Sequence, residues 1–218
     1  MPAWFDVGVL TVVTAALFAL VVHRVVRVID PRGSRRASVI LLVLATALFG
    51  WALGFEVRHQ RVQATATEVT RELTGNPDAV AVCQRLTPDL LDLSQNAGHV
   101  AWDQPEVSHL RRSTCNAFFS WLVGDKADPS FDQVEAVHVV VHEAMHVAGQ
   151  YDEGVAECWA MQSDAEAAEL LGADPEDARA LADAYYREHF PFMHPAYRHG
   201  GCTDGGGLDL TPGDGQFP

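Results

Sequence analysis

Two long apolar runs dominate the first quarter of the chain. The first extends from Trp4 to Val22 and is interrupted only by Asp6, and the second extends from Ala37 to Phe55 without any charged residue. Each approaches the roughly 20 residues that an α-helix needs to cross a bilayer core of about 30 Å. Because neither run has a polar face, two core helices of a soluble domain are a poorer explanation. The pattern predicts two transmembrane helices within residues 1–56.

Arginine residues between the two apolar runs indicate how these helices are oriented. Residues 23–36 contain five arginines and one acidic residue, Asp30, whereas no Lys or Arg precedes the first run. Positive residues in short loops stay on the cytoplasmic side of a membrane. A cleaved signal peptide is disfavoured, because its basic residues would precede the apolar stretch. We therefore expect a multi-pass cell-membrane protein with both ends, and its C-terminal domain, outside the cytoplasm.

Most of the chain beyond the second apolar run has the spacing of helices. Residues 57–76 are polar with helical spacing as far as the stop sequence GNP at 75–77, which predicts a stalk helix. Apolar positions recur at helical intervals in residues 77–93. We expect another helix over 105–123 and a short strand or loop over 98–102. The chain is thus predicted to be mostly α-helical.

Capping residues mark further helices in the second half of the chain. Ser130 and Gln133 match a capping box, so a helix is expected from about Phe131 to Ala148, with Gly149 as its C-terminal cap. Two more helices are expected at residues 152–171 and 175–189. Together with the preceding segments they form a predicted domain over residues 77–202.

The net charge narrows the possible partners, and the composition of the last residues predicts a flexible tail. Residues 56–218 contain 10 Lys and Arg against 27 Asp and Glu, a formal net charge of −17. Such a surface repels nucleic acid, so no nucleic-acid partner is expected. The final segment, 203–218, is rich in Gly and Pro and is predicted to be a flexible tail.

All four cysteines lie in the part of the chain that the arginine pattern places outside the cell. They are Cys83, Cys115, Cys158 and Cys202. An even number of cysteines in an oxidising compartment usually means disulfides, whereas a cysteine zinc site would need CxxC-type spacing. Spacing does not decide among the three possible pairings; we favour Cys83 with Cys115 and Cys158 with Cys202.

The sequence HEAMH at residues 142–146 carries the most specific chemistry. His142 and His146 are four residues apart on a predicted helix, so both imidazoles project from one face and can reach one metal ion. Zinc accepts such ligands, and a catalytic zinc site has three protein ligands and a water molecule. Glu143 would be the general base that takes a proton from the zinc-bound water. The alternative is an ordinary half-buried helix face.

The residues after this motif resemble a known family. HExxH, a glycine turn and an acidic pair on the next helix resemble the gluzincin metallopeptidases. The string EGVAECWA is also similar to the one after HExxH in small membrane-anchored zinc peptidases of the bacterial type. The resemblance implies Glu153 as the third zinc ligand and Glu157 as the carboxylate that orients a ligand histidine. It covers about an eighth of the chain, and Glu157 departs from the usual Asp or Asn.

A second resemblance uses the same residues differently. HEAMHVAGQYD also matches HExxHxxGxxD, which resembles the metzincins of the snapalysin type. In that case Asp152 would be the third ligand and Met193 the methionine beneath the metal. Asp152 is also an ordinary helix N-cap, and the segment around Met193 matches the expected turn poorly.

Other polar residues have less specific interpretations. His138 precedes His142 by one helical turn. It could hydrogen-bond to a residue of the metal site, or its hydrogen bonds could serve only to stabilise the fold. In gluzincins a His or Tyr stabilises the tetrahedral intermediate, and the choice here stays open among His189, His194, Tyr197 and His199. Cys158 is better explained as part of a disulfide than as a ligand.

These features predict a membrane-anchored zinc metallopeptidase with a mainly helical, zincin-like domain outside the membrane. Its cofactor would be Zn²⁺ and its substrate a peptide or protein. One alternative is a non-catalytic domain that zinc stabilises or that binds other proteins. Another is a structural partner of a membrane protein, without any metal.

Overall fold

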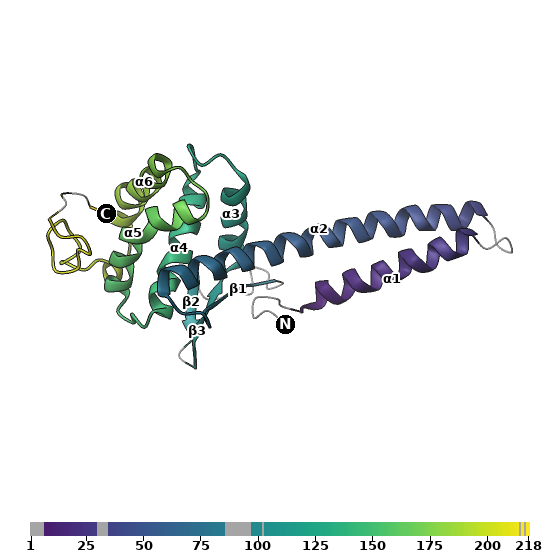
Figure 1. The fold of residues 1–218 in the computed structure, drawn as a ribbon, viewed down its shortest axis with the longest axis horizontal. Coiled ribbons are helices and arrows are strands. Elements are labelled where there is room, and N and C mark those ends of the chain that lie inside the picture. Colours follow the sequence, from purple (N-terminus) through teal and green to yellow (C-terminus); the bar gives the residue numbers. More distant parts are fainter. Residues whose placement is uncertain (1–6, 30–34, 86–96, 102, 214, 216) are drawn as a thin grey trace. The chain divides into compact units, whose positions relative to one another are not determined.

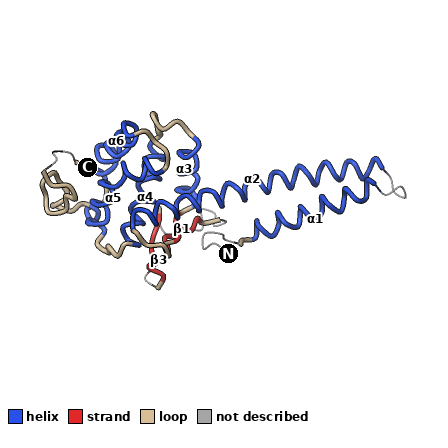
Figure 2. Tube along the Cα trace, viewed as in Figure 1, coloured by secondary structure: helices blue, strands red, loops and turns tan. Residues whose placement is uncertain are grey.

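The computed structural model describes residues 7–29, 35–85, 97–101, 103–213, 215, 217 and 218. The chain divides into two compact units, Met1–Arg61 and Val62–Pro218, which are described separately. The described residues form six α-helices and three β-strands, so the chain is mostly helical as predicted (Figure 2).

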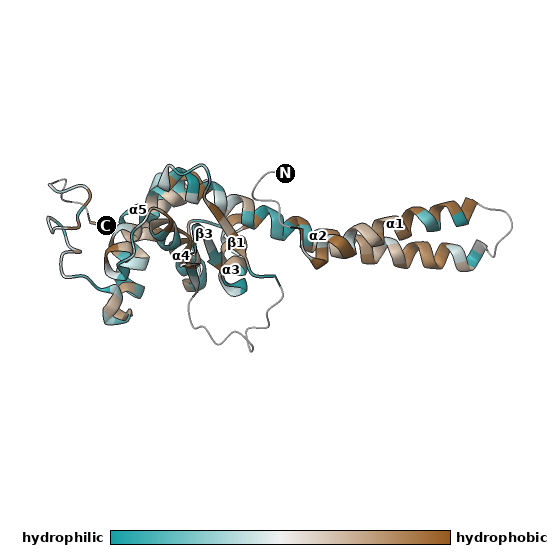
Figure 3. Cartoon of the chain, turned by 90° about the horizontal axis from the view of Figure 1, so that it is seen from below, coloured by the Kyte–Doolittle hydropathy of each residue, from teal (hydrophilic) through white to brown (hydrophobic). Residues whose placement is uncertain are grey.

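The first unit consists of helix α1 (Val9–Ile29) and the first part of helix α2 (Arg35–Thr74). The two helices run beside each other in opposite directions (Figure 1). Ala45 and Ala52 of α2, which are two helical turns apart, are buried. Small side chains of this kind allow two helices to approach closely. Most other apolar side chains of this unit are exposed. The brown colour of both helices in Figure 3 marks their hydrophobic residues. Both helices are long and apolar enough to cross a membrane.

The last part of α2 belongs to the second unit. Val62, Ala66 and Val69 recur at helical spacing and lie in the hydrophobic core. The Thr67 hydroxyl accepts a hydrogen bond from the Ala81 N–H at 3.0 Å. The segment predicted as a stalk is therefore helical as far as Thr74, and its inner face packs against the rest of the domain.

The second unit also contains a small sheet that the apolar spacing did not predict. Strands β1 (Val80–Cys83), β2 (Gly98–Ala101) and β3 (Gln104–Leu110) lie in the order β1-β3-β2. Strand β3 is parallel to β1 and antiparallel to β2. The helical interpretations of 77–93 and of 105–111 were wrong where these strands form. Of the strand or loop expected at 98–102, the described residues 98–101 form a strand. The rest of 77–93, from residue 86, lies outside the described residues.

The reason for this difference is that β3 is paired on both sides. Ser108 and Leu110 alternate with more exposed residues and point into the interior. Backbone pairing on both edges overrides weak local spacing, because strand formation depends more on neighbours than on intrinsic preference. The predicted helix begins only at α3 (Arg112–Val123).

Three helices complete the domain: α4 (Phe131–Val147), α5 (Glu153–Leu170) and α6 (Pro175–Ala184). The bounds of α4 and α5 agree with the predicted ones to within one residue, and α6 begins at the predicted residue. Ser130 N–H donates to Gln133 Oε1 at 2.7 Å, as a capping box requires. Gly149 has φ +92°, the left-handed conformation that ends α4 and turns the chain into α5.

The helix predicted over 175–189 changes type at its end. After α6 the chain forms one π-helical turn, Tyr185–His189. Short 3₁₀ turns follow at Phe190–Phe192 and Pro195–Tyr197. A π-turn inserts an additional residue into a helix, which turns side chains toward positions that an α-helix would not reach.

Two disulfides link the elements of the second unit. Cys83 of β1 is bonded to Cys115 of α3, and Cys158 of α5 to Cys202 near the C-terminus. This is the pairing that we favoured. The described part of the tail also contacts the domain: Gln162 on α5 bonds the backbone at Leu208 and Leu210. Mobility of the tail stays a prediction, and motion would break these contacts.

Candidate metal centre

Helices α4 and α5 bring the predicted ligands together. His142 and His146 lie one turn apart on α4, and Glu153 is the first residue of α5. The turn at Gly149 folds α5 back along α4, so Glu153 returns to the face that carries both histidines. A five-residue connection between the two helices is therefore enough to assemble three candidate ligands.

The ligand atoms of these residues converge on one point. His142 Nε2 lies 3.1 Å from His146 Nε2, and Glu153 Oε2 lies 3.2 and 3.3 Å from these two nitrogens. Ligands about 2.0–2.1 Å from a tetrahedral zinc ion are separated by about 3.3–3.4 Å, by simple geometry. The three groups therefore have the spacing of a metal site, and they could hold a metal ion.

Outer partners orient both imidazoles. His146 Nδ1 lies 2.6 Å from the Gln150 carbonyl oxygen, and His142 Nδ1 lies 2.9 Å from Glu157 Oε2. The second contact is an ion pair by distance, although it lacks the alignment of a good hydrogen bond. Each Nδ1 proton thus faces an acceptor, which leaves both Nε2 lone pairs directed at the shared point. Two lone pairs and a carboxylate at this spacing repel one another unless a cation or protons lie between them.

The pKa values of the three candidate ligands also indicate that positive charge is stabilised between them. Burial alone would lower the pKa of His142, but the contacts with the Glu153 and Glu157 carboxylates outweigh burial and raise it to about 9. Hydrogen bonds to both histidines lower the pKa of Glu153 to about 2. The pKa of His146 is also raised, because the contact with Glu153 outweighs its burial. A bound cation would replace these protons.

Glu143 lies beside the centre against the first residue of β2. Its side chain is buried, at 4 % exposure, and Oε2 has no hydrogen-bond partner among the described residues. A Cβ atom added at Gly98 would lie 2.7 Å from Glu143 Oε1. Burial raises the pKa of Glu143 to about 7, despite the nearby His142 and His146. The carboxyl group can therefore exchange a proton near neutral pH.

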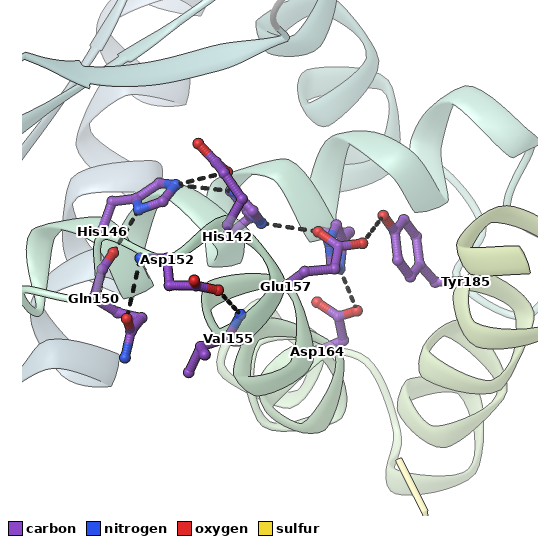
Figure 4. Close-up of polar contacts among 10 residues, drawn as sticks. His142, His146, Gln150, Asp152, Val155, Glu157, Asp164 and Tyr185 are labelled. Atoms are coloured by element: carbon purple, nitrogen blue, oxygen red, sulfur yellow. Dashed lines mark hydrogen bonds and ion pairs between the residues drawn. The ribbon is translucent and has the colours of Figure 1, made fainter. Parts of the chain in front are cut away.

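A second group lies deeper, below His142. His138 Nε2 lies 3.1 Å from Glu157 Oε2, and His138 Nδ1 lies 2.8 Å from Asp164 Oδ2. The Tyr185 hydroxyl donates to Glu157 Oε1 at 2.6 Å (Figure 4). Burial opposes the charge of His138, but the two carboxylates raise its pKa to about 10. His138, His142 and Glu157 could also hold a metal ion, although here each is already paired within a fully buried network.

The group formed by His142, His146 and Glu153 faces a cavity of about 710 Å³ between β2, α4 and the segment after α6. His142, Glu143, His146 and Glu153 all line it. Of the four residues considered for stabilising an intermediate, His189, His194 and Tyr197 line the cavity. His199 is not among the lining residues and lies against Gly154 instead. Tyr197 has its ring centre 5.8 Å from that of His142.

Asp152 and Met193, the two metzincin candidates, have different surroundings in the structure. Asp152 caps α5, where its Oδ1 accepts from the Val155 N–H at 3.0 Å. It belongs to neither group of ligand atoms among the described residues. Met193 lines the cavity. Glu153 is therefore the residue that completes the group around His142 and His146.

Some residues of the site were not found from the sequence. Gly98 and Gln150 act through backbone atoms, which leave no signal in a pattern of side chains. Tyr185 reaches Glu157 from a π-turn, and no spacing rule places it there. Asp164 was detectable, because it lies seven residues after Glu157 and so on the same face of α5.

Fold and centre define a mostly helical protein with histidine and glutamate groups that could hold a metal ion. No protein-family model, no curated protein and no solved structure matches the chain. The functional assignment therefore depends on the chemistry of the centre.

Proposed function

We propose that the chain is a membrane-anchored zinc metallopeptidase whose domain lies outside the membrane. The observation that carries the proposal is the convergence of His142, His146 and Glu153 at separations of 3.1–3.3 Å, at the surface of a cavity. Two imidazoles and one carboxylate are one of the ligand sets found in catalytic zinc sites, among them those of zinc peptidases. Three ligands on two adjacent helices leave the cavity side open for a water molecule and a substrate.

Each residue of the centre has a distinct task in this proposal. Bound zinc supplies a Lewis acid that polarises a carbonyl group and makes a water molecule more acidic. Glu143 accepts a proton from the attacking water and delivers it to the leaving amine, which its pKa of about 7 allows near neutral pH. Glu157 holds the His142 ring, and Tyr197, whose ring centre lies 5.8 Å from that of His142, is a candidate for stabilising the intermediate.

The cavity supports an extended peptide as substrate. Residues 98–101 of β2 line it, and within the described sheet β2 lies at the edge, paired only with β3. An edge strand offers unpaired backbone groups that an extended peptide can bind by adding a strand. The acidic domain disfavours nucleic acid as a partner.

Replacing Glu143 with Gln tests the enzymatic part of the proposal. Glutamine keeps the shape of the side chain but cannot accept a proton, so we expect peptide hydrolysis to fall by about 10²–10⁴-fold. Zinc content should stay at the wild-type value, because Glu143 is not among the converging ligand atoms. Hydrolysis is followed with a mixture of denatured proteins, and zinc by elemental analysis.

The same variant separates the enzyme from a non-catalytic zinc domain. If the wild-type chain binds zinc but E143Q and wild type are equally inactive on every peptide offered, zinc serves the fold alone. A wild-type chain without bound zinc would rule out both functions.

A further inference from the structure

The network below the metal centre joins three elements of the domain. His138 comes from α4, Glu157 and Asp164 from α5, and Tyr185 from the π-turn after α6. All four side chains are buried, with exposures of 0–2 %. Burying ionisable groups is unfavourable unless each has a partner, and every one of these side chains has at least one.

Glu157 lies at the centre of this network with both oxygens engaged. Oε1 accepts from the Tyr185 hydroxyl at 2.6 Å, and Oε2 lies 3.1 Å from His138 Nε2. The same Oε2 lies 2.9 Å from Nδ1 of the ligand His142. Contacts on both oxygens restrict rotation of the carboxylate. Tyr185 and His138 therefore fix its orientation toward His142.

His138 is itself held on both sides and on its face. Asp164 lies 2.8 Å from its Nδ1, and the Tyr185 ring is stacked on its ring with centres 3.5 Å apart and planes 13° apart. A network meant only to join the helices would not need to end on a ligand. This one continues through Glu157 to His142 (Figure 4).

We propose that His138 is a positioning residue which, supported by Asp164 and Tyr185, acts through Glu157 to hold His142 for metal binding. This inference rests on the proposed metal centre and adds residues to it. Groups that orient a ligand histidine commonly change metal affinity by 10–100-fold. The packing of α4, α5 and the π-turn against one another thereby fixes the orientation of the His142 imidazole.

The test measures the affinity of the full-length chain for Zn²⁺, in detergent, by competition with a chromophoric chelator. We expect H138Q to weaken zinc binding by about 10–100-fold. In an E157Q background the same substitution should change the affinity by less than about twofold, because the residue through which His138 acts is gone. Y185F should weaken binding in the same direction and by less, since it removes one contact to Glu157 and keeps the ring.

A matched control separates positioning from general loss of stability. Thr67 is also buried and bonds the backbone of β1, outside the cavity. T67V should lower the denaturant midpoint of the metal-free chain and leave the zinc affinity unchanged. Y185F provides the decisive measurement if H138Q does not fold, because it retains the ring that stacks on His138.

Two results would overturn the inference. One is an unchanged zinc affinity in both H138Q and Y185F. The other is an equal loss of affinity with and without Glu157, which would mean that the network acts only on the fold. If wild type binds zinc and hydrolyses peptides in either case, only the role of His138 is lost. If wild type binds no zinc, the metal centre and this inference fail together.

Discussion

At the scale of single residues, Gly98 decides where the Glu143 carboxylate lies. The side chain of Glu143 packs so closely on Gly98 that a Cβ atom there would lie 2.7 Å from Oε1 and 2.8 Å from Cγ. Glu143 is buried, so its displaced side chain would have to adopt another rotamer within a confined space. Gly98 is therefore required for the position of the proposed base.

We predict that G98A lowers kcat for peptide hydrolysis by about 10–10²-fold, since a misplacement of about 1 Å can have that effect. Zinc affinity should stay within about twofold of wild type, because none of the converging ligand atoms touches Gly98. Steady-state kinetics and chelator competition measure the two quantities. G200A is the matched control, because an added Cβ there meets nothing within 4 Å. An unchanged kcat in G98A would show that Glu143 is not positioned by this contact.

The protonation of His142 predicts how zinc affinity depends on pH. Its pKa of about 9 in the metal-free chain means that at pH 7 the ring carries a proton that zinc must displace. A lower pH increases the protonated fraction, so the apparent affinity should fall about tenfold per unit from pH 9 to pH 7. Protonation of His146 makes the dependence steeper below its own raised pKa.

Calorimetry in buffers of different ionisation enthalpy counts the protons that zinc releases. We expect at least one proton per zinc ion at pH 7 and a smaller number near pH 10. Binding without proton release and with constant affinity over this range would contradict the protonation of the centre described above.

At the scale of elements, the helices around the centre were the most predictable part. Ser130 and Gln133 defined the start of α4, and Gly149 its end, because capping uses local side chains and backbone conformations that the sequence shows directly. The HExxH spacing then placed both histidines on one face. Local signals were thus sufficient for α4 and α5.

The sheet was not predictable in the same way. Val80 and Val82 in β1 are separated in sequence from their partners in β3 by 27 residues, as the register Val80 with Val107 shows. Pairing over such distances is a tertiary effect that local apolar spacing does not contain. The helix assigned to residues 105–111 failed for this reason. A strand or loop was expected where β2 forms, but its pairing with β3 and its place beside the cavity were not.

The π-turn explains a further part of the site that sequence reasoning missed. Tyr185 and His189 stack with ring centres 5.0 Å apart, and Phe131 stacks on His189 at 3.6 Å. These contacts accompany the change from α6 to π-helical geometry, which no residue in the segment signals by itself. The role of Tyr185 became visible only from its contact with Glu157.

At the scale of the whole molecule, the disulfides and the apolar helices support one location. Disulfides such as Cys83–Cys115 and Cys158–Cys202 are typical of proteins in oxidising compartments, and both lie in the unit that follows the two apolar helices. The arginines between these helices favour a cytoplasmic loop. The two observations depend on different residues, and both favour a domain outside the cytoplasm.

The proposed location predicts how the cysteines and a C-terminal reporter behave in intact cells. All four cysteines should resist a thiol-specific reagent until a reductant is added, and a C-terminal reporter that is active only outside the cytoplasm should be active. A second reporter, inserted in the arginine-rich loop, is the control and should be inactive. Free thiols together with an inactive C-terminal reporter would contradict the proposed topology.

The central claim is that His142, His146 and Glu153 bind one zinc ion. X-ray absorption spectroscopy of the zinc-loaded, full-length chain tests this most directly, with E153Q as comparison. We predict one zinc ion per chain with two imidazole nitrogens at about 2.0–2.1 Å and carboxylate oxygen at about 2.0–2.2 Å, and a loss of this oxygen in E153Q. A spectrum with sulfur at about 2.3 Å, with a single imidazole, or unchanged in E153Q would contradict the account.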